Sequence, residues 1–336
     1  MAAPLAAIFG CAGPRLSADE KAFFRDADPW GFIVFARNIE KPEQVAALTA
    51  EMRDCLGRGA PVLVDQEGGR VQRLRAPHWR EFIPAMQELK GRTLEQAAEA
   101  HVMRALLIAR ELHAVGIDVN CAPLLDVATD ALHPAIGERA LGTDPSTVAG
   151  LGHAIRQGMK AGGVLPVIKH LPGYGRSEVD PHESLPIIRA SREELAVDFA
   201  PFEAHNDALM GMTAHLIISA IDDEYPATFS GPCIDLIRED IGFDGLLMTD
   251  DISMGALSGT IEDRARASID AGCDIVLHCN GERAEMEAVA AGSGNLEGVA
   301  LTRAAAVDAA PRQPDDIDIA LVEARYKSLQ VEPCHA

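Results

Sequence analysis

The stretch VLPVIKHLPGYGRSEVDPHESLP, residues 164–186, decides how the rest of the chain is interpreted. Its first five residues are all apolar, which predicts a short buried strand. Lys169 and His170 stand where that strand ends, and the chain then enters a loop broken by proline and glycine. A strand that delivers a cation and an imidazole into such a loop is more typical of a functional site than of a structural connection.

Apolar runs of this kind alternate with stretches of helical periodicity along nearly the whole chain. Eight runs are predicted to be strands: 6–10, 31–35, 61–64, 117–123, 164–168, 209–213, 245–249 and 274–277. The helical stretches between them include 42–56, 94–115, 147–162, 193–207, 232–241 and 261–272. Ser17 with Glu20, and Ser191 with Glu194, have the spacing of a capping box and predict two helix starts.

Strand–helix alternation predicts a parallel sheet covered by helices. Eight such units favour a single α/β domain, a closed (β/α)8 barrel of TIM type spanning residues 1–336, with a loose tail after about residue 328. An open, doubly wound sheet is the alternative, because periodicity alone does not show closure. The first predicted strand is not followed by G-x-G-x-x-G, which disfavours a dinucleotide-binding fold.

In a barrel the active site lies at the carboxyl ends of the strands, so the polar residues there form a candidate set. These residues, in chain order, are Asp65 with the segment 66–73, Asp126, Arg139, Lys169, His170, His215, Asp250, Asp251, His278 and Asn280. We expect several of them to converge on one rim of the barrel.

Asp250 and Asp251 are adjacent, and adjacent strand residues face opposite sides of a sheet. We therefore expect one of the two to point into the barrel mouth, as nucleophile, base or metal ligand, and the other to cap the next helix or turn. Asp180 lies two residues before His182, so in an extended loop both side chains point the same way. A carboxylate beside His182 would orient the imidazole for proton transfer near neutral pH, although a solvated loop histidine fits the pattern equally well.

Composition excludes several classes of function. The formal net charge is −21, and no basic stripe suited to nucleic acid or to an anionic membrane surface is present. No apolar run approaches the ~20 residues that a membrane span needs. The seven cysteines form no C-x-x-C pair, which fits a reducing compartment. Because the amino-terminal apolar run is short and lacks a basic segment, we interpret it as a barrel strand and expect a cytoplasmic protein.

Four motifs together carry a resemblance to a known family: VDQEGGRVQRL at 64–74, GERALGTD at 137–144, KHLPGYG through DPH to LP at 169–186, and TDDISM at 249–254. In this order and spacing they resemble family 3 glycoside hydrolases, in particular the single-domain bacterial β-N-acetylhexosaminidases of peptidoglycan recycling. The resemblance extends from about residue 8 to about residue 280.

The resemblance implies a retaining mechanism with no cofactor and no metal. It assigns the nucleophile to Asp250, the proton donor and acceptor to His182, and the orientation of that histidine to Asp180. It assigns the binding of N-acetylglucosamine to Asp65, Arg73, Arg139, Lys169 and His170. The implied substrate is a muropeptide with N-acetylglucosamine β-1,4-linked to 1,6-anhydro-N-acetylmuramic acid, and we expect a monomer that binds neither nucleic acid nor membrane.

Two positions depart from the family pattern. Tyr174 stands where the family usually has histidine, and we expect its hydroxyl to keep a hydrogen bond. Pro181 stands where the family usually has serine and stiffens the link between Asp180 and His182.

Three other functions remain as alternatives. The nearest is a phosphorylase or β-glucosidase of the same family, since an uncharged imidazole tolerates an incoming phosphate better than a carboxylate would. A metal-dependent barrel hydrolase would use His170, His182, His215 and Asp250 as ligands. The sequence, however, lacks the closely spaced pair of histidines that such an enzyme usually has on its first strand. A barrel that binds sugar without hydrolysing it would have the same pocket but no catalytic activity.

Overall fold

The structure is a computed structural model that describes residues 3–130, 132–133, 137–179 and 184–329. The predicted Asp180 and His182, together with Pro181 and the tail beyond residue 329, lie outside the described residues.

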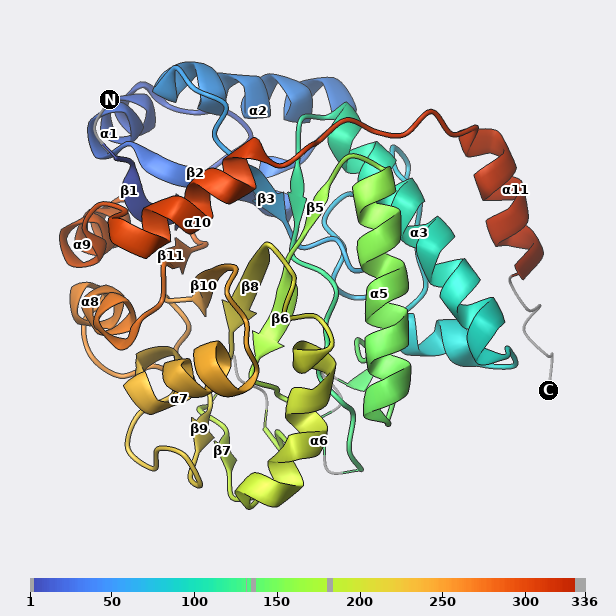
Figure 1. Ribbon diagram of the computed structural model, residues 1–336. Coiled ribbons are helices and arrows are strands. Elements are labelled where there is room, and N and C mark those ends of the chain that lie inside the picture. Colours follow the sequence, from blue (N-terminus) through green and yellow to red (C-terminus); the bar gives the residue numbers. More distant parts are fainter. Residues whose placement is uncertain (1–2, 131, 134–136, 180–183, 330–336) are drawn as a thin grey trace.

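Nine parallel strands form the central sheet in the order β5-β4-β3-β2-β1-β11-β10-β8-β6 (Figure 1). Their bounds are β1 Leu5–Phe9, β2 Pro29–Val34, β3 Val62–Val64, β4 Val119–Asn120, β5 Leu165–Pro166, β6 Ile168–Leu171, β8 Met210–Thr213, β10 Leu246–Asp251 and β11 Ile275–His278. β5 and β6 are the first and last strands in this order, and only Val167 separates them along the chain. This one continuous segment therefore joins the two edges of the sheet. The sheet is therefore a ring of eight chain segments, and the prediction of a barrel is confirmed. Each of the eight predicted runs overlaps one segment.

Helices surround this ring in Figure 1. Their bounds are α1 Ala18–Ala27, α2 Pro42–Leu56, α3 Leu94–Ala114, α5 Pro145–Ala161, α6 Arg192–Glu203, α7 Gly231–Asp235, α8 Ile261–Ala271, α9 Arg283–Ser293, α10 Gly298–Ala309 and α11 Ile319–Leu329. Ser17 and Ser191 both form the predicted capping boxes, at the starts of α1 and α6. Two short strands, β7 Ile187–Ile188 and β9 Ile217–Ile218, make a separate parallel pair.

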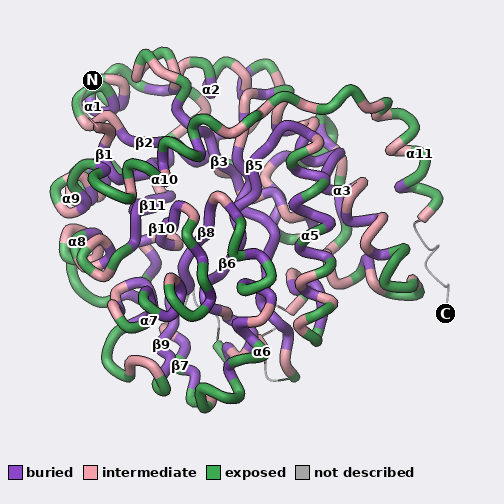
Figure 2. The backbone as a smooth tube through the Cα atoms, viewed as in Figure 1, coloured by how far each residue is buried: buried purple, intermediate pink, exposed green. Residues whose placement is uncertain are grey.

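The residues of the barrel strands are mostly buried, as Figure 2 shows by their purple colour inside a largely green and pink periphery. Along β1, Ala6 and Ile8 belong to the cluster that fills the barrel, whereas Ala7 and Phe9 pack in the layer between strands and helices. A strand buried on both faces has a continuous apolar sequence, which is why these runs were recognisable.

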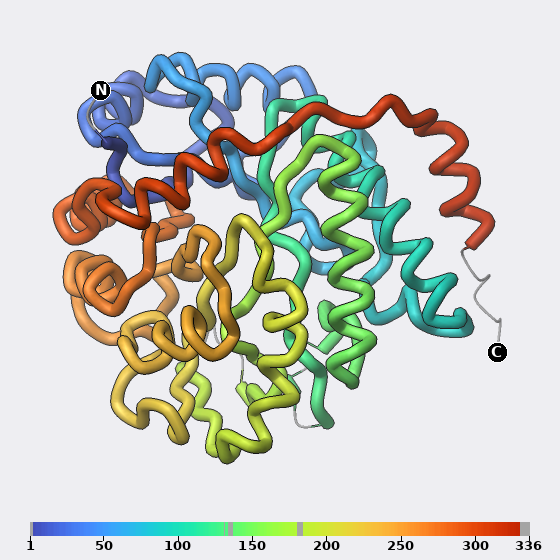
Figure 3. Tube along the Cα trace, viewed as in Figure 1, coloured from blue at the N-terminus to red at the C-terminus, as the bar shows by residue number. Residues whose placement is uncertain are grey.

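The amino-terminal end of the barrel is closed by the segment that follows α9. The N–H of Leu296 donates to the carbonyl of Pro4, next to the start of β1, at 2.9 Å. Leu296 and, from α10, Ala304 and Val307 join the cluster inside the barrel. From there the chain crosses to α11, which packs against α3 (Figure 3). With this end filled, the opposite end is the one left for a pocket.

Among the described residues, no helix is both long enough and apolar enough to cross a membrane.

Candidate active site

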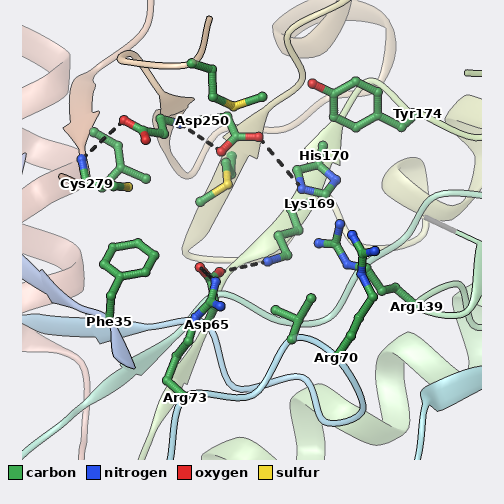
Figure 4. Close-up of a pocket in the computed structure, with 15 residues that line it drawn as sticks. Phe35, Asp65, Arg70, Arg73, Arg139, Lys169, His170, Tyr174, Asp250 and Cys279 are labelled. Atoms are coloured by element: carbon green, nitrogen blue, oxygen red, sulfur yellow. Dashed lines mark hydrogen bonds and ion pairs between the residues drawn. The ribbon is translucent and has the colours of Figure 1, made fainter. Parts of the chain in front are cut away.

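A pocket of about 570 Å³ opens at the carboxyl ends of the barrel strands (Figure 4). Its lining residues come from loops or strand ends all around the ring: Phe35, Asp65, Arg70, Val71, Arg73, Arg139, Lys169, His170, Tyr174, Met212, Asp250, Asp251, Met254, Leu277 and Cys279. The expected convergence of polar strand-end residues therefore holds for Asp65, Arg73, Arg139, Lys169, His170 and the two aspartates of β10.

Asp250 faces the barrel interior. Leu246 and Met248 on the same strand belong to the cluster inside the barrel, whereas Leu247 packs outward against helices. Alternation along the strand puts Asp250 in phase with the inward residues. Its Oδ1 accepts the N–H of Asp251 at 2.8 Å, and its Oδ2 lies 4.0 Å from Nε2 of His170. The side chain keeps 20% of its surface exposed, so it can be reached from the pocket.

Asp251 is engaged in holding the backbone. Its Oδ1 accepts the N–H of Ser253 at 3.1 Å and the N–H of Cys279 at 3.2 Å, and the Ser253 hydroxyl donates to both carboxylate oxygens at 2.9 Å. The carboxylate thus caps the turn after β10 and ties it to the residue following β11. This is the division between the two aspartates that strand alternation predicts.

The charge of Asp250 is stabilised by its surroundings. Burial alone would raise the pKa of this carboxyl, but the neighbouring imidazoles of His170 and His215, the N–H of Asp251 and the charge of Lys169 outweigh it. The pKa of Asp250 therefore lies below its ordinary value, and the group is an anion at neutral pH.

Two carboxylates with low exposure, Asp65 and Glu67, form a network with three cations at the pocket wall. Asp65 accepts from Nζ of Lys169 at 3.0 Å and from the Arg73 guanidinium at 3.2 Å. Glu67 pairs with Arg139 through two hydrogen bonds, of 2.9 and 2.8 Å, and lies 2.7 Å from Nζ of Lys169. The pairing of Lys169 with a buried carboxylate leaves its ammonium group fixed at the pocket wall.

The network keeps all of its members charged. Burial would raise the pKa of Asp65 and of Glu67, but the adjacent Lys169, Arg73 and Arg139 lower both pKa values below the ordinary range. Burial would lower the pKa of Lys169, but the two carboxylates raise it. Glu67 lies within the motif at 64–74, yet the sequence pattern assigned it no role. Charge balance could have indicated a role for Glu67. The predicted sugar-binding residues included four cationic or titratable side chains but only one carboxylate, so a second carboxylate was to be expected nearby.

Asp126 orients the ring of His170. Its carboxylate is buried and follows β4, in the fourth segment of the ring. Oδ2 of Asp126 lies 2.9 Å from Nδ1 of His170, and its Oδ1 accepts the N–H of Tyr174 at 2.6 Å. The Tyr174 ring meets the His170 ring edge to face, with centroids 4.9 Å apart. With Nδ1 held by a carboxylate, Nε2 is the nitrogen turned toward Asp250.

Tyr174 keeps a hydrogen bond, as expected. The N–H of His215 donates to its hydroxyl oxygen at 2.6 Å, and the side chain is almost fully buried. The ring nitrogens of His215 contact the Thr228 hydroxyl at 2.8 Å and the carbonyl of Asp251 at 3.1 Å. Burial lowers the pKa of His215. This histidine therefore supports the pocket wall and is not one of its lining residues.

His278 and Asn280 also fall outside the pocket lining, because both bind the Glu285 carboxylate, at 3.0 and 2.6 Å. Within the part of the chain that the structure describes, no three His, Cys, Asp or Glu side chains are grouped as metal ligands. His182, which the metal-dependent alternative also required, is not among those residues.

Residues 7–312 match the glycosyl hydrolase family 3 N-terminal domain. The chain belongs to glycosyl hydrolase family 3. It is therefore a glycoside hydrolase, and the family that the four motifs suggested is confirmed.

Relatives in this family align over most of their length. A β-hexosaminidase of Methylococcus capsulatus is 40% identical over 282 residues, which cover 81% of this chain and 82% of the relative. The crystal structure of NagZ from Neisseria gonorrhoeae in complex with N-trifluoroacetyl-D-glucosamine superposes with a TM-score of 0.80 at 31% identity, covering 97% of this chain and 98% of that one. A β-N-acetylhexosaminidase from Beutenbergia cavernae gives a TM-score of 0.75 at 28% identity, covering 96% and 95%.

Proposed function

We propose that this glycoside hydrolase removes terminal β-linked N-acetylglucosamine with retention of configuration, using Asp250 as the nucleophile. One observation carries the proposal: an ionised carboxylate faces into a polar pocket and is reachable from it. Among the described residues, Oδ2 of Asp250 accepts no hydrogen bond, and its nearest ion-pair partner is Nε2 of His170 at 4.0 Å. An oxygen in this position is free to form a bond to an anomeric carbon.

A retaining glycosidase also needs a group that protonates the leaving oxygen and later deprotonates water. The other carboxylates near the pocket are occupied, since Asp65 and Glu67 are held by cations and Asp251 caps a turn. Among the pocket residues that the structure describes, no carboxylate is left for this step. On the resemblance of the four motifs to the family, we assign it to His182, with Asp180 as the group that orients its imidazole.

In this mechanism Asp250 attacks the anomeric carbon while the bond to the leaving oxygen breaks, and that oxygen takes the proton of His182. The glycosyl-enzyme ester is then hydrolysed by a water that gives its proton back to His182. The positive charge that develops on the sugar ring is adjacent to the Asp250 carboxylate, where it is stabilised most.

The sugar itself would be held by the charged network. Asp65 offers carboxylate oxygens to sugar hydroxyls, and Arg73, Arg139, Lys169 and His170 offer N–H donors that are already fixed in position. Preorganised donors of this kind lose little freedom when substrate binds. The names of the relatives, β-hexosaminidase and β-N-acetylhexosaminidase, and the N-acylglucosamine in the Neisseria structure support N-acetylglucosamine as this sugar.

As the natural substrate we propose the muropeptide in which N-acetylglucosamine is β-1,4-linked to 1,6-anhydro-N-acetylmuramic acid. The support is the resemblance of the four motifs to bacterial enzymes of peptidoglycan recycling. The same resemblance supports a cytoplasmic, monomeric, single-domain enzyme.

Mass spectrometry of protein inactivated by a 5-fluoro N-acetylglucosaminyl fluoride tests the nucleophile and the covalent mechanism together. We expect one glycosyl group on the peptide that contains Asp250, and the same label in an Asp251→Asn control. A label on another residue would refute the assignment. Products formed with and without phosphate, identified as free sugar or sugar phosphate, separate hydrolysis from phosphorolysis.

A further inference from the structure

Four cationic side chains line the pocket, and one of them has no partner among the described residues. Arg73 pairs with Asp65, and Arg139 and Lys169 both pair with Glu67. The fourth, Arg70, is exposed, and its guanidinium makes no hydrogen bond or ion pair with any described residue. Arg70 is therefore a cation of the pocket lining that is available to a ligand.

The backbone beneath Arg70 is firmly held. Residues 68–71 form a tight turn in which the N–H of Gly68 donates to the carbonyl of Val71 at 3.0 Å. A Cβ on Gly68, whose φ is 99°, would lie 2.0 Å from the Arg104 guanidinium, so the turn is packed closely against α3. Because the turn is fixed, ordering Arg70 on a ligand would cost only the entropy of its own side chain.

Arg70 lies on the outer part of the pocket. The inner wall is made by residues such as Met212 and Leu277, which belong to the filled barrel, so a sugar cannot pass through. Lys169, with 3% of its side chain exposed, marks the deep part, whereas Arg70 is exposed at the mouth. A terminal sugar that occupies the deep part must direct its leaving group outward, toward the mouth.

We propose that Arg70 forms a leaving-group subsite that selects glycosides whose leaving group carries an anionic substituent, a carboxylate. The inference rests on the proposed function, because it needs a terminal sugar seated above Asp250. A guanidinium offers two parallel N–H donors to a carboxylate, a geometry that neutral hydroxyls do not match. The surrounding chain carries a net charge of −21 and would otherwise disfavour an anionic substrate.

The experiment compares two aryl N-acetyl-β-glucosaminides, one with a para-carboxylate and one with its neutral methyl ester. The ratio of their kcat/KM values is measured for the wild type, Arg70→Gln and Arg266→Gln. Arg266 is a matched control because it is an arginine with 51% of its side chain exposed, on α8, that does not line the pocket. For each variant, the kcat/KM for the carboxylate substrate is divided by the kcat/KM for the ester. This ratio cancels differences between variants in the folded fraction and in the chemistry at Asp250.

We expect Arg70→Gln to lower the carboxylate-to-ester ratio by about fivefold, the size of a partly solvated ion pair, and Arg266→Gln to leave it unchanged. The effect should shrink as salt is raised, because the pair is exposed. Equal loss on both substrates would overturn the inference and place Arg70 on the sugar. An equal ratio in the wild type and in Arg70→Gln would overturn it too.

Turnover of the neutral ester with and without inorganic phosphate shows whether Arg70 binds the leaving group of the substrate or a free anion. If phosphate accelerates turnover of the ester in the wild type but not in Arg70→Gln, the anion is free phosphate and the leaving-group assignment is wrong. If the wild type does not hydrolyse the neutral ester at all, the proposed function fails, which is a different outcome from hydrolysis without preference for the carboxylate.

Discussion

Replacing Glu67 by glutamine removes one charge from the centre of the pocket network while keeping the shape of the side chain. Glu67 has 8% of its side chain exposed, Arg139 has 10% and Lys169 has 3%, so the change would affect three charged groups with little exposure to solvent. The amide can accept one hydrogen bond but presents an NH₂ group to the other cation. Removing one partner of a buried pair costs about 3–5 kcal/mol, because the remaining charge stays buried.

Glu99→Gln is a control with the same pairing and different burial. Glu99 binds Arg325 through two hydrogen bonds of 2.9 and 2.8 Å, the same pattern as Glu67 with Arg139. The side chains of Glu99 and Arg325 are 36% and 53% exposed, and a solvated pair of this kind contributes about 0–1 kcal/mol. Denaturant unfolding at neutral pH measures both variants. A loss in Glu67→Gln no larger than that in Glu99→Gln would refute the role assigned to the buried network.

The pH dependence supplies a second measurement on the same variant. The pKa of Glu67 in the folded protein lies below its ordinary value of 4.5, because Arg139 and Lys169 outweigh the effect of burial. A depressed carboxylate contributes its full stabilisation above the unfolded pKa and loses it as pH falls toward the folded pKa. The difference between wild type and Glu67→Gln should therefore be constant near neutrality and shrink below about pH 4.5. A difference that grows on acidification would contradict the direction of this shift.

Four other outcomes are expected. Asp250→Ala abolishes turnover of an aryl N-acetyl-β-glucosaminide, whereas Asp251→Ala leaves measurable activity; the assignment of the pair is wrong if Asp251→Ala is the inactive variant. His182→Ala loses less activity on substrates with good leaving groups than on those with poor ones, and equal losses would argue against an acid role. Asp126→Asn lowers kcat/KM by about tenfold to hundredfold in a correctly folded protein, the equivalent of one hydrogen bond to a charged group, because His170 loses the carboxylate that orients its ring; wild-type activity in this variant would argue against the orienting role. Prolonged EDTA treatment leaves turnover unchanged, and a loss that zinc restores would favour the metal-dependent alternative.

The barrel could be predicted because its strands are buried on both faces. Runs such as 209–213 and 245–249 are largely apolar, and that pattern depends only on local sequence. The same local rule predicted that one of Asp250 and Asp251 would face inward, and the resemblance to the family selected Asp250. Closure was favoured by the eight strand–helix units, but periodicity alone did not show it, since the join depends on β6 pairing with β8 while β5 pairs with β4.

The site was only partly predictable for a related reason. Residues that end a strand, such as Lys169 and His170, could be placed at the rim from the sequence. Whether a rim residue turns into the pocket depends on its partners, and these come from distant parts of the chain. His278 and Asn280 both turn to Glu285 on α9, whereas Glu67 is drawn into the network by Arg139, 72 residues away.

By itself, then, the sequence determined the alternation of strands and helices, the rim on which the polar residues gather and the family to which the motifs belong. The tertiary structure alone decided which charges are paired within the protein, as with Arg139, and which have no partner among the described residues, as with Arg70. The physical reason is that hydrophobic periodicity is a property of neighbouring residues, whereas the environment of a charge is set by side chains that only the folded chain brings within a few ångströms.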